Sequence, residues 1–159
     1  MNKRVLVKKI ISRLTEELSV YFRAANASRA EATHEQNKAE SKYDTRGLEA
    51  SYLARGQSKQ AAELEAAIAE FENLKIGKFA DGDKIDISAL VELETGAERF
   101  FYFIGPRAGG TEILQDKKEI LVITPQSPLG QQIIGRKAGE KLQLNIGGAV
   151  QSSRIVSVE

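Results

Sequence analysis

Carboxylates in the segment 31–44 are the residues whose types and spacing best suit chemistry. Glu31 and Glu35 are four residues apart, as are Glu40 and Asp44, so on a helix each pair would share one face. Carboxylate oxygens are the ligands that Mg²⁺ prefers, so either pair could converge on one cation. Basic residues lie among these acids, namely Lys38, Lys42 and Arg46. Mixed charges of this kind are also typical of a solvated charged turn. Both interpretations stay open on spacing alone.

Other kinds of catalytic site find no support in the sequence. The chain has no cysteine and one histidine, His34. A disulfide framework, a thiolate nucleophile and a zinc site built on Cys or His are therefore excluded. There is also no nucleophile elbow, Walker phosphate loop or dinucleotide fingerprint. We therefore predict that this protein is not an enzyme in its own right and binds another macromolecule.

Charge and hydropathy narrow the class of partner. The formal net charge is +1, with 23 basic and 22 acidic residues, so no broad cationic surface favours direct binding to duplex nucleic acid. No apolar run approaches the ~20 residues of a membrane span, and charged residues interrupt the start of the chain before a signal-peptide core develops. We expect a cytoplasmic protein without a membrane partner.

Composition changes sharply near Lys75. Only Gly47 and Gly56 of the thirteen glycines precede it, and all three prolines follow it. Uninterrupted helix giving way to turns and strands is the usual cause of such a change. The sequence therefore predicts an α+β protein with two domains, a helical one at 1–75 and a β-rich one at 76–159.

The first domain carries two apolar stripes at helical spacing. The first stripe consists of Ile10, Ile11, Leu14, Leu18, Tyr21 and Phe22, and the second of Tyr52, Leu53, Ala61, Leu64, Ile68, Phe71 and Leu74. Folding one stripe on the other predicts an antiparallel α-helical coiled-coil hairpin with its tip at about 35–45. A dimerisation or spacer coiled coil is the alternative.

The second domain shows strand alternation separated by turn residues. About five strands are expected, at 84–94, 99–104, 119–124, 141–146 and 150–158, forming an antiparallel sheet. Between the third and the fourth, Ser127 suits a helix cap, Pro128 the first helical position and Gly135 the end, which predicts one short helix. The aromatic run 100–103 indicates a core strand more than a base-stacking surface.

The stretch Ile123-Thr124-Pro125-Gln126-Ser127-Pro128-Leu129-Gly130-Gln131-Gln132-Ile133-Ile134-Gly135-Arg136-Lys137-Ala138-Gly139-Glu140 resembles the Gre family of bacterial transcript-cleavage factors. The order and lengths of the two domains are also similar to those of the Gre family, and this similarity covers the whole chain. The resemblance implies an FKBP-like C-terminal domain that docks on the rim of the RNA polymerase secondary channel, and a hairpin that enters the channel. It makes Ser127, Pro128 and Leu129 candidates for the docking loop, and further candidate partner contacts are Lys38, Lys42 and Arg46.

The tip departs from the family pattern. Family members that stimulate cleavage carry an Asp and, three residues later, a Glu, followed by Asn-Ala-Glu-Tyr. The nearest stretch here is Glu35-Gln36-Asn37-Lys38-Ala39-Glu40-Ser41-Lys42-Tyr43-Asp44, which has no Asp-x-x-Glu pair. The resemblance then leaves Glu35, Glu40 and Asp44 as candidate metal ligands. Any Mg²⁺ would be shared with the polymerase active centre, since we expect no cofactor of the protein's own.

We therefore expect a monomeric Gre-like transcription factor that binds bacterial RNA polymerase, modulates elongation or transcript cleavage, and meets RNA and DNA only indirectly in the elongation complex. The first alternative is a regulator or inhibitor of the same channel that does not stimulate cleavage. An FKBP-type peptidyl-prolyl isomerase and a chaperone are further alternatives. The isomerase lacks support because the aromatic residues cluster on one strand, and the chaperone because the tip is charged.

Overall fold

The structure is a computed structural model of the chain, and it describes residues 1–33 and 46–159. Its contacts divide the chain into two units. The helical unit is Ser12–Ala69, and the sheet unit combines Met1–Ile11 with Glu70–Glu159. The composition break at Lys75 marks where helix gives way to strands, whereas this division follows packing, and it assigns both ends of the helical region to the sheet unit.

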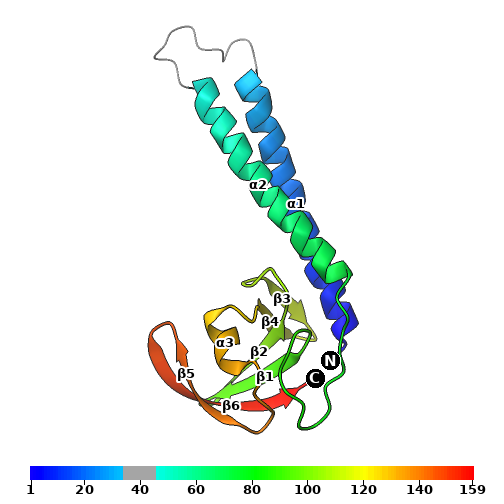
Figure 1. The fold of residues 1–159 in the computed structure, drawn as a ribbon, viewed down its shortest axis with the longest axis vertical. Coiled ribbons are helices and arrows are strands. Elements are labelled where there is room, and N and C mark those ends of the chain that lie inside the picture. The colour runs from blue at the N-terminus through cyan, green and yellow to red at the C-terminus, as the bar shows by residue number, and fades with distance from the viewer. Residues whose placement is uncertain (34–45) are drawn as a thin grey trace. The chain divides into compact units, whose positions relative to one another are not determined.

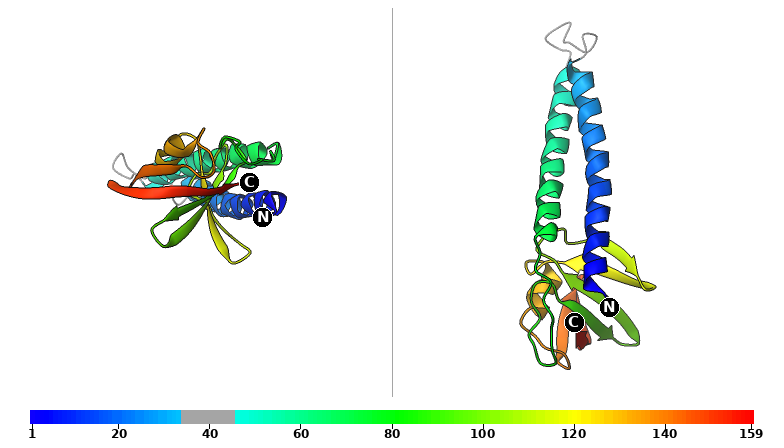
Figure 2. Two further views of the ribbon diagram at one scale, coloured as in Figure 1. Left: turned by 90° about the horizontal axis from the view of Figure 1, so that it is seen from below. Right: turned by 90° about the vertical axis from the view of Figure 1, so that its right-hand side faces the viewer.

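Two long helices account for the N-terminal half. Helix α1 spans Lys3–Thr33 and helix α2 spans Arg46–Glu72. Within the helical unit they run side by side in opposite directions (Figures 1 and 2). Leu14, Ala61 and Ala67 are buried in this unit. The two predicted helices are therefore confirmed, while coiled-coil supercoiling stays a prediction and the expected tip lies outside the described residues.

The sheet unit contains a six-stranded mixed sheet. Its strands are β1 (Leu90–Thr95), β2 (Glu98–Ile104), β3 (Glu112–Gln115), β4 (Lys118–Ile123), β5 (Lys141–Ile146) and β6 (Ala149–Val158). They lie in the order β3-β4-β2-β1-β6-β5. Every neighbouring pair is antiparallel except β2 and β4, which are parallel, with Tyr102 opposite Leu121.

The prediction of a wholly antiparallel sheet of about five strands was wrong, because it overlooked β3. The turn between β3 and β4 consists of Asp116 and Lys117, which take φ of 51° and 61°. This turn contains no glycine, the residue that usually indicates a turn with positive φ in a sequence. Strand β3 lies at the sheet edge, where its exposed side chains are tolerated, and β4 with its buried apolar residues lies inside. Strand β4 then runs parallel to β2.

Strand β1 also begins later than expected. The sequence indicated a strand from residue 84, whereas β1 starts at Leu90. Ser88 takes φ of 71° in the left-handed region, so extended structure cannot run through it. The Ser88 hydroxyl accepts a hydrogen bond of 2.8 Å from the Gly77 amide, which ties this segment to the connector after α2.

Helix α3, Pro128–Ile133, packs on one face of the sheet. Its Ile133 is fully buried in a cluster of apolar residues, namely Ile85, Ala89, Val91, Leu93, Ile104, Ile123, Ile133, Leu142, Leu144 and Ile155. Burial of this area is the main stabilising contribution to the unit. The α+β class predicted from the sequence is thus confirmed.

The opposite face of the sheet is covered by the beginning of α1 and the end of α2. Leu6, Ile10 and Phe71 are at most 1% exposed. A Cβ atom on Gly105, which directly follows β2, would lie 2.9 Å from the Phe71 ring, so this ring reaches the sheet. Lys9 Nζ donates to the Leu114 carbonyl on β3 at 2.9 Å. The first turns of α1 therefore belong to the core of the sheet unit.

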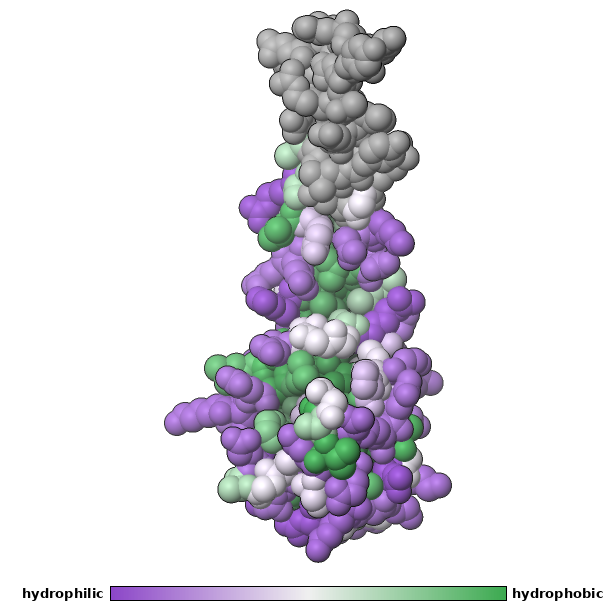
Figure 3. Space-filling view, turned by 90° about the vertical axis from the view of Figure 1, so that its left-hand side faces the viewer, coloured by the Kyte–Doolittle hydropathy of each residue, from purple (hydrophilic) through white to green (hydrophobic). Residues whose placement is uncertain are grey.

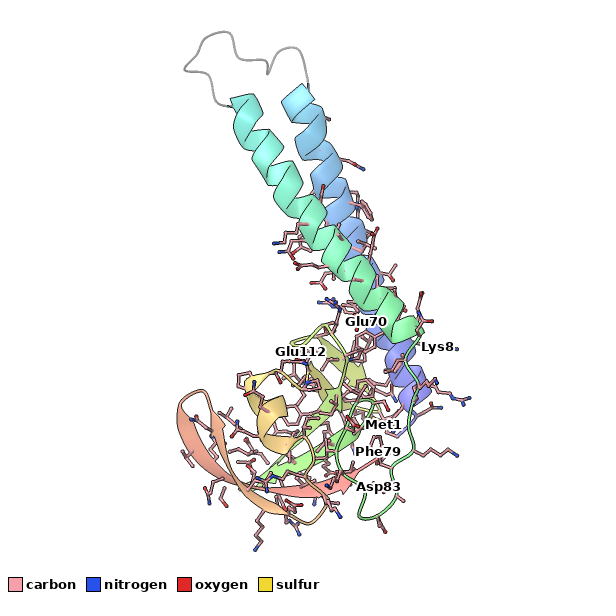
Figure 4. All side chains as sticks on the ribbon, viewed as in Figure 1. Met1, Lys8, Glu70, Phe79, Asp83 and Glu112 are labelled. Atoms are coloured by element: carbon pink, nitrogen blue, oxygen red, sulfur yellow. The ribbon has the colours of Figure 1, made fainter. Side chains whose placement is uncertain are left out.

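The connector between α2 and β1 is held to the start of α1. Lys3 Nζ donates to the Gly77 carbonyl at 2.6 Å and lies 4.7 Å from the centre of the Phe79 ring, which is labelled in Figure 4. Across the described ranges, no helix is both long enough and apolar enough to cross a membrane.

Candidate docking site

Hydrogen bonds of the Ser127 hydroxyl stabilise the start of the candidate docking loop. Ser127 has an extended backbone (φ −64°, ψ 154°) and caps α3, because its Oγ accepts a hydrogen bond of 3.0 Å from the Gly130 amide. The same Oγ donates to the Thr124 carbonyl at 2.7 Å. Ser127 therefore holds the loop in shape and keeps little hydrogen-bonding capacity for a partner.

Pro128 and Leu129 divide the contact and anchoring roles. Pro128 occupies the first helical position, as the sequence predicted, and is exposed. Leu129 is half-buried and packs against the core cluster. The structure thus brings the three predicted docking residues together, with Pro128 offering its side chain to solvent and Leu129 joining the loop to the core.

Gly130 lets α3 approach the end of β4. A Cβ atom at this position would lie 1.9 Å from the Thr124 carbonyl oxygen and 2.8 Å from Ser127 Oγ, well inside van der Waals contact. No side chain fits there without moving the backbone. The sequence showed a glycine within a predicted helix, but only the structure shows the close approach that requires it.

The glutamines of α3 fix the helix to its surroundings. Gln131 Nε2 donates to the Gln126 carbonyl at 3.0 Å. Gln132 Nε2 donates to the Asn145 carbonyl at 3.0 Å, and Gln132 Oε1 accepts from the Asn145 amide at 2.8 Å. Because Asn145 lies on edge strand β5, Gln132 takes the place of a neighbouring strand at that position. Sequence reasoning missed this role, which depends on a contact between two separate elements.

Most of the predicted tip residues lie outside the part of the chain that the structure describes. These are Glu35, Lys38, Glu40, Lys42 and Asp44. Arg46 begins α2, but its side chain is outside the described part as well. Within residues 1–33 and 46–159, no group of three or more His, Asp or Glu side chains could hold a metal ion. The metal and partner assignments at the tip remain predictions.

Shifted pKa values occur elsewhere in the sheet unit. The hydrogen bond from Arg154 to Glu94, 2.6 Å long, lowers the pKa of the Glu94 carboxyl. Burial lowers the pKa of Lys3, opposed by Glu159, and burial raises the pKa of Tyr102. The stretch 127–135 itself has no ionisable side chain. The loop therefore offers no side chain for acid–base chemistry.

The aromatic run on β2 is divided between the two faces of the sheet. Phe103 is fully buried, whereas Phe100 is 39% exposed. Phe100 and Tyr102 help to line an open depression of about 470 Å³ together with Leu114 and Leu121. The run thus contributes to the core, as the sequence indicated. The depression was missed because Leu114 belongs to the overlooked strand β3.

Three solved structures similar to this chain are of Gre-type transcription factors. GreA factor homolog 1 of Thermus thermophilus is 22% identical with a TM-score of 0.40, covering 94% of each chain. Gfh1 of Thermus aquaticus is 23% identical with a TM-score of 0.41, covering 93% of this chain and 92% of that one. The transcription elongation factor GreA/GreB of Nitrosomonas europaea is 19% identical with a TM-score of 0.37, covering 70% and 91%. No family model and no curated protein matches the chain.

Proposed function

We propose that this protein is a Gre-like transcription factor that binds the secondary channel of bacterial RNA polymerase in the cytoplasm and modulates elongation or transcript cleavage. The observation that carries the proposal is the Ser127-capped loop. The stretch Ile123–Glu140, which resembles the family's docking segment, forms an ordered helix start with Pro128 at its surface.

The loop is built to bind without rearrangement. Hydrogen bonds to Thr124 and Gly130 already satisfy the Ser127 hydroxyl, and the close approach at Gly130 limits the loop's conformations. A surface ordered before binding loses less conformational entropy when its partner docks. Pro128 adds an apolar side chain, and because proline has no backbone N–H, docking at this position does not have to desolvate a donor.

The helical unit supplies the arm in this proposal. Helices α1 and α2 are 31 and 27 residues long, so each extends roughly 40 Å or more at ~1.5 Å per residue. We propose that they form the coiled-coil hairpin that enters the channel and that the tip at 35–45 reaches towards the active centre. The polymerase active centre would catalyse the cleavage reaction.

Two versions of the proposal differ at the tip. In the cleavage version, Glu35, Glu40 and Asp44 would help to hold a magnesium ion shared with the polymerase, which would activate the water that attacks RNA. In the regulatory version, the tip occupies the channel without delivering metal. The absence of an Asp-x-x-Glu pair in this stretch favours the regulatory version.

Retention on immobilised core RNA polymerase tests the binding proposal. Wild type should be retained, and Pro128→Glu should weaken retention about tenfold or more, because it places a charge in the docking contact. Val150→Glu is the matched control, since Val150 is 69% exposed and lies on β6, outside the loop. A wild-type protein that is not retained would overturn the proposal.

A transcript-cleavage assay on backtracked complexes separates the two versions. If wild type stimulates cleavage, Glu35→Gln, Glu40→Gln and Asp44→Asn identify the carboxylates involved. Binding without stimulation selects the regulatory version. A variant lacking residues 24–47 should then lose its effect on elongation while the docking loop stays intact.

A further inference from the structure

Helix α3 is too short to cover its face of the sheet. Six residues extend about 9 Å at ~1.5 Å per residue, whereas six strands spaced by ~4.8 Å span roughly 24 Å between the outer strands. Tyr102 and Leu121 pack at the margin of the core cluster. Beyond them the β2, β4 and β3 part of this face forms the depression of about 470 Å³.

Large apolar side chains line this depression and remain accessible. Leu114 is 65% exposed and Phe100 is 39% exposed, while Tyr102 and Leu121 are half-buried. The molecular face drawn in Figure 3 shows hydrophobic residues next to one another between hydrophilic ones. Apolar residues that occur singly on a protein surface require no explanation. Four that share one depression are different, because such a cluster marks an interaction site.

Carboxylates alternate with the apolar side chains across the strands. Glu112, labelled in Figure 4, lies opposite Leu121, and Glu119 lies opposite Leu114. Both carboxylates line the depression. The surface therefore presents a mixed pattern in which each acidic group has an apolar neighbour within one strand spacing.

These carboxylates have no cation of their own. Across residues 1–33 and 46–159, neither Glu112 nor Glu119 forms an ion pair. Nearby basic groups are occupied: Arg99 pairs with Glu92 at 2.6 Å, and Lys118 lies 4.3 Å from the centre of the Phe101 ring. Lys117, in the turn after β3, is the remaining cation at the rim. A basic partner would supply the missing complement.

A partner cannot bind by adding a strand to the edge of β3. Lys9 Nζ donates to the outward-facing Leu114 carbonyl, and Gln115 Nε2 donates to the Asn2 carbonyl at 3.1 Å. The start of α1 thus occupies the position where an added strand would pair. A partner must lie on the face of the sheet, where a helix can bury an apolar stripe and place basic residues beside it.

We propose that the depression lined by Phe100, Tyr102, Leu114, Leu121, Glu112 and Glu119 is a second protein-binding surface, and that its occupant is a basic amphipathic helix of a partner protein. Aliphatic side chains of this helix fill the space between Phe100 and Leu114. Lysine or arginine side chains one turn away pair with Glu112 and Glu119. None of these six residues belongs to the docking loop formed by Ser127, Pro128 and Leu129.

The test uses the full-length protein and a synthetic helical peptide of about 14 residues, roughly four turns, with leucines on one face and lysines flanking them. Binding followed by amide chemical shifts should move resonances of β2, β3 and β4. Leu114→Glu should weaken binding about tenfold, and Leu114→Gln should weaken it less. Val150→Glu should leave it unchanged.

A charge-reversed peptide with glutamates in place of lysines completes the test. It should bind the wild type at least tenfold more weakly, and the double variant Glu112→Gln with Glu119→Gln should remove most of that difference. Failure of the lysine peptide to bind, shifts confined to other elements, equal binding of the two peptides, or equal binding by Leu114→Glu would each overturn the proposal.

Discussion

At the scale of single residues, two small side chains determine the docking loop. Ser127 closes the loop through hydrogen bonds to Thr124 and Gly130, and Gly130 allows the backbone of α3 to reach the Thr124 carbonyl. Both effects act through the backbone. Substitutions at either position should therefore change the stability of the sheet unit as well as binding.

We predict that Gly130→Ala destabilises the sheet unit by about 3 kcal/mol or more, because the new methyl group would have to displace the Thr124 carbonyl. Gly109→Ala is the matched control, since its Cβ would meet its nearest atom, on Thr124, at an ordinary 3.5 Å. Denaturant unfolding of the full-length protein measures both. Equal stability of the two variants would contradict the close approach.

At the scale of elements, the sheet unit depends on the start of α1. Leu6 and Ile10 are fully buried, although they lie 80 residues or more before the first strand. The Asn2 side chain caps this helix by accepting hydrogen bonds from the amides of Arg4 and Val5. Helix α1 therefore begins in the sheet unit and continues into the helical unit.

We expect Leu6→Ala to destabilise the sheet unit by roughly 2–5 kcal/mol, the cost of removing a buried leucine side chain. Val5→Ala should change stability much less, because the neighbouring Val5 is 42% exposed. Hydrogen exchange of β2 and β4 amides in the full-length protein reports on the sheet directly. Unchanged protection in Leu6→Ala would show that this helix start is dispensable.

At the scale of the whole molecule, charge is nearly balanced. The net charge of +1 provides few of the phosphate contacts on which non-specific nucleic-acid binding depends. In the proposed function, RNA and DNA are met only within the polymerase complex. In these proposals the protein depends on specific surfaces, the docking loop and the depression on the sheet, to bind its partners.

The free protein should bind duplex DNA more weakly than the ~10⁻⁴ M limit of typical non-specific binders at physiological salt. Fluorescence anisotropy with a labelled duplex measures this, and the same duplex within an elongation complex is the positive comparison. Micromolar binding by the free protein, abolished by added salt, would show a cationic surface that the balanced charge does not reveal.

Local signals in the sequence were sufficient for several features of this protein. Apolar spacing of three and four residues predicted two long helices, because a helix repeats every 3.6 residues whatever its partner. Ser127 and Pro128 predicted the start of α3, since capping depends on atoms within one turn. The predicted break between the strands at 141–146 and 150–158 coincides with the β5–β6 turn, where Gly147 and Gly148 take positive φ.

Features that depend on contacts between distant segments were decided only by the tertiary structure. The Asp116–Lys117 turn lacks glycine, so neither β3 nor the parallel pairing of β2 with β4 could be predicted. Burial of Leu6 requires the sheet to be present, and the depression at Leu114 exists because α3 stops short of it. Local sequence specifies backbone conformation, whereas which surfaces meet depends on the packing of the whole unit.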